Sequence, residues 1–468
     1  MKKHLLILLF AILILPVGCE KDPIDWLEST AKDTNYYGNM FAYNIMDTYY
    51  LWREEMSDGF DSWTFGDDPV EKVKSLRYKD ANGNLVDKWT SLMEDCSSFL
   101  GSVTGNTKSL GFDFSLYYKD EIKYSVVIVV NFTYAGSPAA LAGLKRGDVI
   151  ITLDGQELNT DNYVAMVKEK LLGGGTVTMG LKGGQSMTME AVQMYENPVH
   201  TVRTLDVGGK KIGYLHFTSF TLDACRDLEE AFRQFCADGI EEMVLDLRYN
   251  SGGYTQTSTV LASMLAPADV VSAGSVFLRD VYNKTLEESD AFKDELTTSF
   301  GSEFKISDSS DGSSYTVYPL QVNPGVRKLW VITTGSTASA SEALICGLKP
   351  YMTVTTVGEK TYGKFCGGYL IQAENFFELL SRQEGVKIDT SEGAEKLAGW
   401  GIYVIASRYS DKDGVTLSMP SGIPADYKEE DNPRDGYQLG DPSETMLAKV
   451  LALSGGTPAL ASAGAAAG

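Results

Sequence analysis

The sequence predicts an α/β protein with more than one domain. Its 468 residues exceed the length at which a single hydrophobic core usually serves a whole chain. From about residue 200 onward, apolar strand patterns alternate with helical patterns, which is typical of a layered α/β domain. Residues 105–196 instead contain short strand patterns separated by glycine-containing turns. We therefore expect a small helical domain, a β-rich domain and a large α/β domain.

The composition excludes several classes of protein. With 41 basic and 63 acidic residues the net charge is −22, which argues against nucleic acid as a partner. Only His4, His200 and His216 are histidines, and no H-E-x-x-H motif or close cysteine pair indicates zinc. We predict no metal and no cofactor. After Cys19, five cysteines remain, and this odd number does not indicate a disulfide scaffold.

The first 19 residues have the pattern of an export signal. A basic start is followed by an apolar run at residues 5–15 that is too short to span a bilayer comfortably. The run P-V-G-C ending at Cys19 resembles a bacterial lipobox, with Pro16 where leucine is usual. This resemblance implies a lipid anchor at Cys19 and a location in the cell envelope, at the outer membrane, either periplasmic or surface-exposed. A plain signal with an incidental cysteine is the alternative.

Residues 20–104 are predicted to form a linker and a small helical domain. Aromatic and apolar residues recur there at three- and four-residue steps, and they mark a helix face that must pack on something. These residues are Tyr37, Met40, Phe41, Ile45, Tyr49 and Trp52.

Residues 105–196 carry a recognisable run, G-S-P-A-A-L-A-G-L-K-R-G-D-V-I-I at 136–151. It predicts a turn, a short helix and a strand, and it closely resembles the same region of PDZ domains. Ser109-Leu110-Gly111-Phe112 stands where that family has its carboxylate-binding loop. The resemblance implies that the backbone of Leu110, Gly111 and Phe112 binds the C-terminus of a peptide that adds as a strand beside it. A PDZ fold that only packs against its neighbour is the alternative.

The residues best suited to catalysis lie within residues 197–453. The run T-A-S-A-S-E at 337–342 connects a strand pattern to a helical pattern, where a serine hydroxyl is open and backbone N–H groups point at it. Lys364 ends a glycine-containing turn after a further strand pattern at 354–357. The ends of neighbouring parallel strands converge on one edge of a sheet. A lysine can then act as a base for a serine if desolvation lowers its pKa. Helix capping by the serine is the alternative.

These residues resemble the catalytic core of the C-terminal processing (tail-specific) serine peptidases. In that family the central serine of T-A-S-A-S-E is the nucleophile and a lysine 25 residues later is the base, which correspond here to Ser339 and Lys364. The run D-L-R-x-N-x-G-G at 246–253 resembles the segment that donates one oxyanion N–H. The donor implied here is Gly253, joined by the N–H of Ala340. Asp246 and Arg248 are predicted to form an ion pair that holds this turn.

The resemblance extends over residues 105–453. It implies an α/β layered peptidase core (ClpP/crotonase-like) with an inserted PDZ domain, next to the small N-terminal helical domain. The implied function is endopeptidase cleavage of proteins whose C-terminal tail the PDZ domain captures. The alternative is a catalytically impaired, PDZ-based peptide-binding surface lipoprotein. A penicillin-binding type of Ser/Lys hydrolase would need a K-T-G motif, and none occurs.

One position departs from the family pattern. Many relatives place a glutamine four residues after the lysine, where it bonds to the lysine; Gly368 stands at that position here. Gln372 is a candidate substitute. The sequence does not predict an oligomeric state, and the Ala/Gly-rich residues 454–468 are expected to be disordered.

Overall fold

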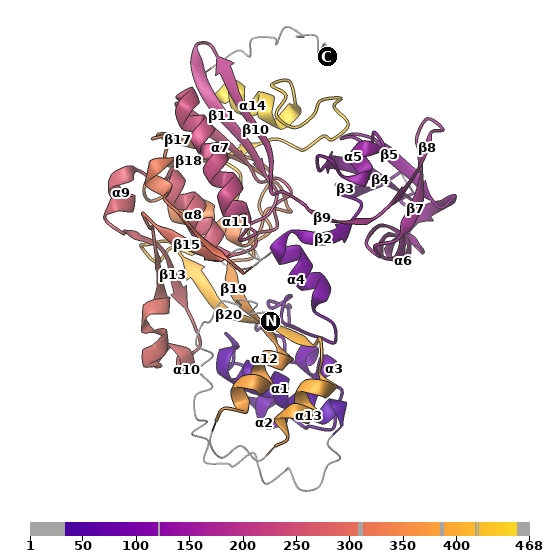
Figure 1. Ribbon diagram of the computed structural model, residues 1–468, viewed down its shortest axis with the longest axis vertical. Coiled ribbons are helices and arrows are strands. Elements are labelled where there is room, and N and C mark those ends of the chain that lie inside the picture. The colour runs from indigo at the N-terminus through magenta and orange to yellow at the C-terminus, as the bar shows by residue number, and fades with distance from the viewer. Residues whose placement is uncertain are drawn as a thin grey trace. The chain divides into compact units, whose positions relative to one another are not determined.

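The computed structural model describes residues 33–119, 122–307, 312–383, 388–416, 419 and 421–455. The predicted signal segment with Cys19, and the predicted tail from residue 456 onward, lie outside these residues. The chain divides into two compact units (Figure 1). The first contains the described residues of Met1–Leu100, Val276–Ser299 and Gly363–Gly422. The second contains those of Gly101–Ser275, Phe300–Tyr362 and Ile423–Gly468.

The first unit is larger than the predicted N-terminal helical domain. Residues 276–299 and 363–422, which the sequence places within the peptidase core, belong to the same unit as residues 33–100. The reason is that the aromatic helix face needs an apolar partner, and the strands within these two segments provide it.

A five-stranded antiparallel sheet organises the first unit. Its long strand, β20 (Gly401–Ser410), pairs along one edge with β19 (Cys366–Gln372). The opposite edge of β20 pairs with β1 (Ser91–Met93) at one end and with β13 (Val276–Val281) at the other. The short strand β14 (Thr297–Ser299) continues the sheet beyond β13.

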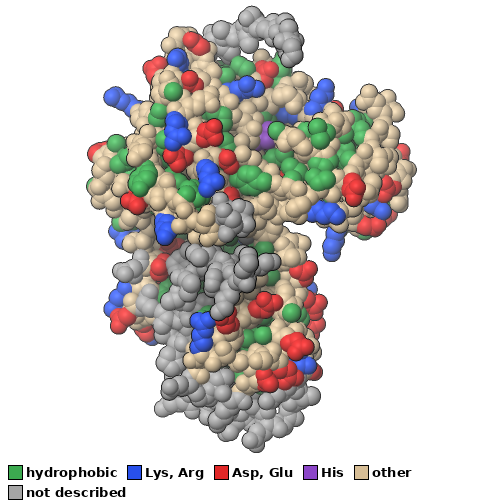
Figure 2. All heavy atoms as spheres, in the orientation of Figure 1, with side chains coloured by type: hydrophobic (Ala, Val, Ile, Leu, Met, Phe, Trp, Pro, Cys, Tyr) green, Lys and Arg blue, Asp and Glu red, His purple; other side chains and the backbone are tan. Residues whose placement is uncertain are grey.

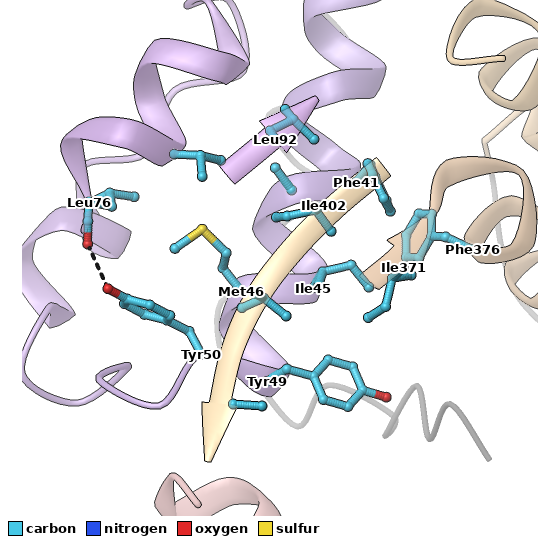
Figure 3. Close-up of a cluster of buried hydrophobic side chains, with 14 of the residues drawn as sticks. Phe41, Ile45, Met46, Tyr49, Tyr50, Leu76, Leu92, Ile371, Phe376 and Ile402 are labelled. Atoms are coloured by element: carbon cyan, nitrogen blue, oxygen red, sulfur yellow. Dashed lines mark hydrogen bonds between the residues drawn. The ribbon is translucent and has the colours of Figure 1, made fainter. Parts of the chain in front are cut away.

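Helix α1 (Thr34–Tyr49) packs against this sheet and contributes many side chains to the core of the first unit. Asp33 starts the helix by accepting the Tyr36 N–H at 2.9 Å. Figure 3 shows Phe41, Ile45 and Met46 beside apolar side chains of the strands and of neighbouring helices. The helix also buries residues outside the predicted stripe, such as Asn39 and Ala42, because later segments cover its other sides.

The remaining helices of the first unit are short. They are α2 (Ser57–Asp61), α3 (Pro69–Ser75), α10 (Lys284–Glu287), the 3-10 helix η3 (Asp290–Leu296), α12 (Ala373–Leu380) and α13 (Thr390–Lys396). Helix α4 (Ser97–Thr104) crosses the boundary into the second unit.

A six-stranded sheet forms the centre of the second unit. Its order is β10-β11-β12-β17-β18-β21, with β10 antiparallel to β11 and all other neighbours parallel. The strands are β10 (Val199–Val207), β11 (Lys210–Phe217), β12 (Glu242–Asp246), β17 (Lys328–Thr333), β18 (Thr353–Gly358) and β21 (Tyr427–Lys428). The predicted alternation of strands and helices is confirmed, and the strand predicted at 328–333 matches β17 residue for residue.

Helices cover both faces of this sheet (Figure 1). Side chains alternate between faces along a strand. On β11, Tyr214 packs with α14 (Thr445–Leu453), whereas a Cβ at Gly213 would lie 3.1 Å from Phe235 of α7 (Ala224–Asp238) on the other face. The other helices and strands of this layer are α8 (Thr255–Leu265), α9 (Ala268–Ser272), α11 (Ala340–Leu348), the 3-10 helix η4 (Pro319–Gln321), β15 (Phe304–Ser307) and β16 (Ser314–Val317).

The β-rich part of the second unit has its own core. Its sheet has the order β3-β4-β6-β5-β7-β8, which leaves β3 at an edge. The strands are β3 (Phe112–Tyr118), β4 (Ser125–Thr133), β5 (Val149–Leu153), β6 (Gln156–Asn159), β7 (Thr176–Leu181) and β8 (Ser186–Glu190). Two short helices, α5 (Pro138–Leu141) and α6 (Tyr163–Met166) with its π-helical extension η2 (Val167–Leu171), cover it, and β2 (Asn106–Ser109) pairs with β9 (Val192–Tyr195).

The surface is mixed in charge. On the face shown in Figure 2, acidic and basic side chains are interspersed, although the chain as a whole has a net charge of −22. None of the helices in the described ranges is both long enough and apolar enough to cross a bilayer.

Candidate active site

Ser339 lies in a tight turn between β17 and α11, at the end of a central strand of the sheet. Its backbone has φ 55° and ψ −116°, a conformation that costs a non-glycine residue free energy and therefore needs support from its surroundings. The side chain is only partly buried, and Ser339 immediately precedes the first turn of α11. The helix N-terminus thus adds a favourable field for negative charge at this position.

The turn after β12 supplies part of that support. The Ala338 N–H and the Ser341 hydroxyl both donate to the Asn250 carbonyl, at 3.1 Å each. The Asn250 side chain accepts the Gly252 N–H at 2.9 Å. A Cβ at Gly252 would lie 2.7 Å from the Ser339 Cβ, so only glycine allows the two turns to approach this closely.

Two backbone N–H groups beside Ser339 are available to a ligand. Neither the Gly253 N–H nor the Ala340 N–H has a hydrogen-bond partner among the residues that the structure describes. The Ala340 N–H belongs to the first turn of α11, where no helical acceptor exists. Gly253 has φ 140°, and it forms an isolated parallel bridge with Phe220, which lies after the end of β11.

Glu342 joins the Ser339 turn to the chain that follows β18. One carboxylate oxygen, Oε2, accepts the Ser339 N–H at 2.9 Å, and the other, Oε1, accepts the Thr361 hydroxyl at 2.5 Å. The same hydroxyl accepts the Ile423 N–H at 2.6 Å. Glu342 and Thr361 are buried, so these bonds are shielded from water.

Lys364 belongs to the first unit, whereas Ser339 belongs to the second. The Lys364 side chain is half-buried, and its Nζ donates to the Tyr403 hydroxyl at 3.3 Å. Nζ also lies 5.4 Å from the centre of the Trp89 ring, a distance at which an indole attracts a cation. The Lys364 carbonyl accepts the Tyr409 hydroxyl at 3.0 Å. Two tyrosines of β20 therefore hold this lysine at both its side chain and its backbone.

The pKa of Lys364 is raised above its usual value in the first unit. Burial alone would lower the pKa, as the sequence argument requires, but Tyr403, Cys366 and Asp87 oppose that effect and outweigh it. In this arrangement the lysine is protonated at neutral pH. Lys364 must therefore lose its proton, which requires a change in these surroundings, before it can act as a base.

Beneath the Ser339 turn lies a buried charge cluster. Arg248 donates to both carboxylate oxygens of Asp246, which confirms the predicted ion pair. Arg248 also pairs with Glu444, the N-cap of α14, at 2.7 Å. Arg146, which lies within the G-S-P-A run, reaches the same cluster through Glu444 and Asp431. The β-rich domain thereby contributes a charge to the cluster that pairs with Arg248.

The two described histidines lie next to this cluster, and neither is placed as a general base. Nδ1 of His216 and Nδ1 of His200 are 3.0 Å apart, and Nε2 of His200 lies 3.1 Å from the Thr133 carbonyl. A neutral His200 that donates from Nε2 accepts at Nδ1, so His216 donates from its own Nδ1. Burial lowers the pKa of both rings, and the positive charges of Arg248 and Arg146 lower that of His216 further. Both histidines are therefore neutral at pH 7.

The predicted carboxylate-binding loop is partly satisfied by its own domain. Leu110 is buried in the core of the β-rich domain. The Gly111 N–H donates to the Ser109 hydroxyl at 3.0 Å, and that hydroxyl donates to Glu196 at 2.5 Å. Phe112 begins the edge strand β3, which pairs only with β4 among the described strands. The edge of β3 is therefore open to an added strand, while the Gly111 N–H is already engaged.

Several residues of this site carry no signal in the sequence that predicts their contacts. Gly252 and Glu342 lie inside the D-L-R-x-N-x-G-G and T-A-S-A-S-E motifs, but their contacts are formed between turns, which the motifs do not predict. Tyr403 lies 39 residues after Lys364 and carries no sequence signal. Among the described residues, no group of three His, Cys, Asp or Glu side chains is arranged to hold a metal ion.

Comparison with known proteins identifies relatives of this arrangement. Residues 211–428 match peptidase family S41, and residues 130–171 match the PDZ domain. A carboxyl-terminal-processing protease of Picosynechococcus is 27% identical over 290 residues, which cover 60% of this chain and 60% of that protein. A carboxyl-terminal-processing protease of Synechocystis is 28% identical over 236 residues, covering 49% and 48% of the two chains. The chain thus spans about half to three-fifths of the length of these relatives.

Among solved structures, a putative S41 protease from Bacteroides fragilis has a TM-score of 0.63 with this chain at 22% sequence identity. The alignment covers 89% of this chain and 97% of that one. This likeness shows a shared fold.

Proposed function

Because the chain carries a peptidase family S41 domain and a PDZ domain, we propose that it is a serine endopeptidase of the C-terminal processing type. Ser339 is the nucleophile and Lys364 is the base of the proposed dyad. The observation that carries the proposal is a strained, partly exposed serine together with two N–H groups, of Gly253 and Ala340, that have no hydrogen-bond partner among the described residues.

In the proposed reaction, neutral Lys364 takes the proton of the Ser339 hydroxyl as the serine oxygen attacks the scissile carbonyl carbon. The Gly253 and Ala340 N–H groups stabilise the resulting oxyanion. Protonated Lys364 then gives its proton to the departing amine, which leaves an acyl-enzyme. Lys364 next activates a water that hydrolyses this ester, and the free Ser339 hydroxyl is restored.

Covalent geometry supports the pairing of the two residues. The Tyr362 N–H donates to the Thr337 carbonyl at 2.9 Å, so the chain after β18 passes beside the nucleophile turn within the second unit. Lys364 follows two residues later, and two residues of extended chain reach about 7 Å. The lysine side chain adds several bonds of further reach.

The PDZ domain is proposed to capture the C-terminal tail of the substrate. The open edge of β3 supports addition of an extended peptide as a further strand. We also propose that Cys19 anchors the chain by lipid to the outer membrane of the cell envelope. Lipid labelling of the parent, compared with a Cys19→Ser variant, tests that anchor.

The experiment that tests the peptidase uses the chain without residues 1–19. Its substrate is an unstructured protein with an apolar C-terminal tail. Ser339→Ala and Lys364→Ala are expected to abolish cleavage. Ser336→Ala and Lys360→Ala, which alter nearby exposed residues, serve as matched controls and should cleave at the parent rate. Activity that survives Ser339→Ala would show that Ser339 is not the nucleophile. A parent that binds the tail and never cleaves it would support the peptide-binding alternative.

A further inference from the structure

Tyr403 provides the hydroxyl that the Lys364 ammonium contacts. It projects from β20, where its backbone is paired on both sides, with Ser91 of β1 and with Leu370 of β19. Its ring packs against Phe99 with 5.1 Å between ring centres. The hydroxyl is therefore held by a central strand and not by a mobile loop.

Gly368 faces the same tyrosine. A Cβ at this position would lie 2.8 Å from Tyr403 Cζ and 3.0 Å from the Tyr403 hydroxyl oxygen. It would also lie 2.6 Å from the Val404 carbonyl oxygen. No side chain fits there while Tyr403 keeps its place, so the glycine and the tyrosine are two parts of one arrangement.

The candidate substitute from the sequence, Gln372, is engaged elsewhere. Its side-chain amide lies 3.9 Å from Cys96 Sγ, and its carbonyl oxygen accepts from Asn375 at 3.4 Å. It lies at the end of β19, next to α12, whereas Lys364 precedes the start of that strand. Gln372 is thus occupied at the far end of β19 from the lysine.

We propose that Tyr403 is the positioning residue for Lys364, and that Gly368 is the glycine that makes room for it. This inference rests on the proposed function, because it assumes that Lys364 is the base. It accounts for the departure at position 368: the hydrogen-bond partner of the lysine comes from β20 and not from the residue four positions after the lysine.

The chemistry of a phenol suits this task. Its oxygen accepts an N–H from either the ammonium or the neutral amine, so the contact survives when Lys364 gives up or takes a proton. With one N–H fixed on Tyr403, the amine lone pair is restricted in direction. The titratable groups that act on Lys364 within the first unit are Tyr403, Cys366 and Asp87.

The first test is the pH profile of kcat/KM for Tyr403→Phe, which removes only the hydroxyl. Loss of this hydrogen bond lowers the pKa of Lys364, so the acidic limb of the profile should move to lower pH by about one unit. The plateau kcat should fall roughly tenfold with KM unchanged, because the amine is less well oriented. Tyr369→Phe, which removes a hydroxyl bonded to Tyr282 in the same unit, is the matched control and should leave the limb in place.

The second test alters each position alone. Gly368→Gln should be inactive, because a Cβ at this position would collide with Tyr403 and with the Val404 carbonyl oxygen. Tyr403→Ala should lose most activity.

The two proposals fail in different ways. If Lys364→Ala keeps the parent activity, the dyad itself is wrong. If Lys364→Ala is inactive while Tyr403→Phe keeps the acidic limb of the parent pH profile and the parent kcat, the dyad stands and the role of Tyr403 is overturned. A Gly368→Gln variant with the parent activity would likewise show that a glycine at position 368 is not needed to make room for Tyr403.

Discussion

Arg146 and Arg248 donate to the same two carboxylate oxygens, Asp431 Oδ1 and Glu444 Oε1. Both guanidinium groups are fully buried, so their mutual repulsion is tolerated only because the acidic groups around them compensate it. Arg146 comes from the PDZ region, and Arg248 from the turn that leads to Gly253. The same buried charge cluster therefore joins the PDZ region to the core and holds the turn that leads to the proposed oxyanion hole.

Arg146→Met should destabilise this junction. The change leaves two buried carboxylates with one cation fewer, and breaking a buried ion pair by removing one partner costs about 3 kcal/mol or more. The midpoint of urea unfolding should fall, and limited proteolysis should cut between the PDZ region and the core more readily. Lys145→Met, at the exposed neighbouring position, is the control. Equal stability of the two variants would mean that the cluster does not hold the junction.

Gly252→Ala should abolish the proposed peptidase activity while the protein stays folded. The new Cβ would lie 2.7 Å from Ser339 Cβ and 2.9 Å from both the Ala338 oxygen and the Ala340 nitrogen. Displacement of the nucleophile by even about 1 Å can cost roughly a hundredfold in rate. Peptidase assays and circular dichroism, with Gly175→Ala at an open position as control, measure this effect. A Gly252→Ala enzyme with parent kcat would show that the two turns do not need this close approach.

Thr361→Val should lower kcat with little effect on KM. The substitution keeps the shape and removes the hydroxyl that donates to Glu342 Oε1 and accepts the Ile423 N–H, and the loss of buried hydrogen bonds costs about 1–3 kcal/mol. The turn around Ser339 should then be less well fixed. Thr361→Ser keeps the hydroxyl and is expected to restore the parent rate. Identical kinetics of the serine and valine variants would show that the hydrogen bond between Thr361 and Glu342 does not position the proposed nucleophile.

Much of this architecture follows from local patterns. The strand before Ser339 has an apolar centre, the helix after it is rich in apolar residues, and a single motif spans the turn between them. The predicted oxyanion donors are also local, because a glycine-rich turn and a helix N-terminus expose N–H groups wherever they fold. These features depend on neighbouring residues in the chain, so the sequence alone predicts them.

Contacts between distant segments were not predictable in this way. The tie between Tyr403 and Lys364 depends on the register of β20 against β19. The assignment of residues 363–422 to the unit of α1 depends on which apolar faces meet. The motif predicts that the Gly111 N–H binds a carboxylate, but this N–H already donates to the Ser109 hydroxyl. Each of these features arises from packing and not from the spacing of residues.

The proposed capture of a C-terminal tail should strengthen as the pH falls. Burial raises the pKa of Asp113, at the start of β3, to about 6. Above that pH its negative charge opposes a peptide carboxylate at the neighbouring loop, and below it the group is neutral. A peptide α-carboxyl, with a pKa of about 3.5, stays ionised throughout. Between pH 7.5 and pH 5.5 the affinity for an apolar peptide with a free C-terminus should therefore rise roughly tenfold.

Asp113→Asn tests this pH dependence directly. The variant should bind at pH 7.5 as tightly as the parent does at pH 5.5, and its affinity should no longer change between them. Asp161→Asn, at an exposed site of the same domain, should keep the parent profile. Fluorescence titration with the free peptide and with its C-terminal amide separates the carboxylate contribution, because the amide carries no charge for Asp113 to repel. If the amide shows the same pH dependence as the acid, the effect lies elsewhere in the domain and the predicted loop does not receive the carboxylate.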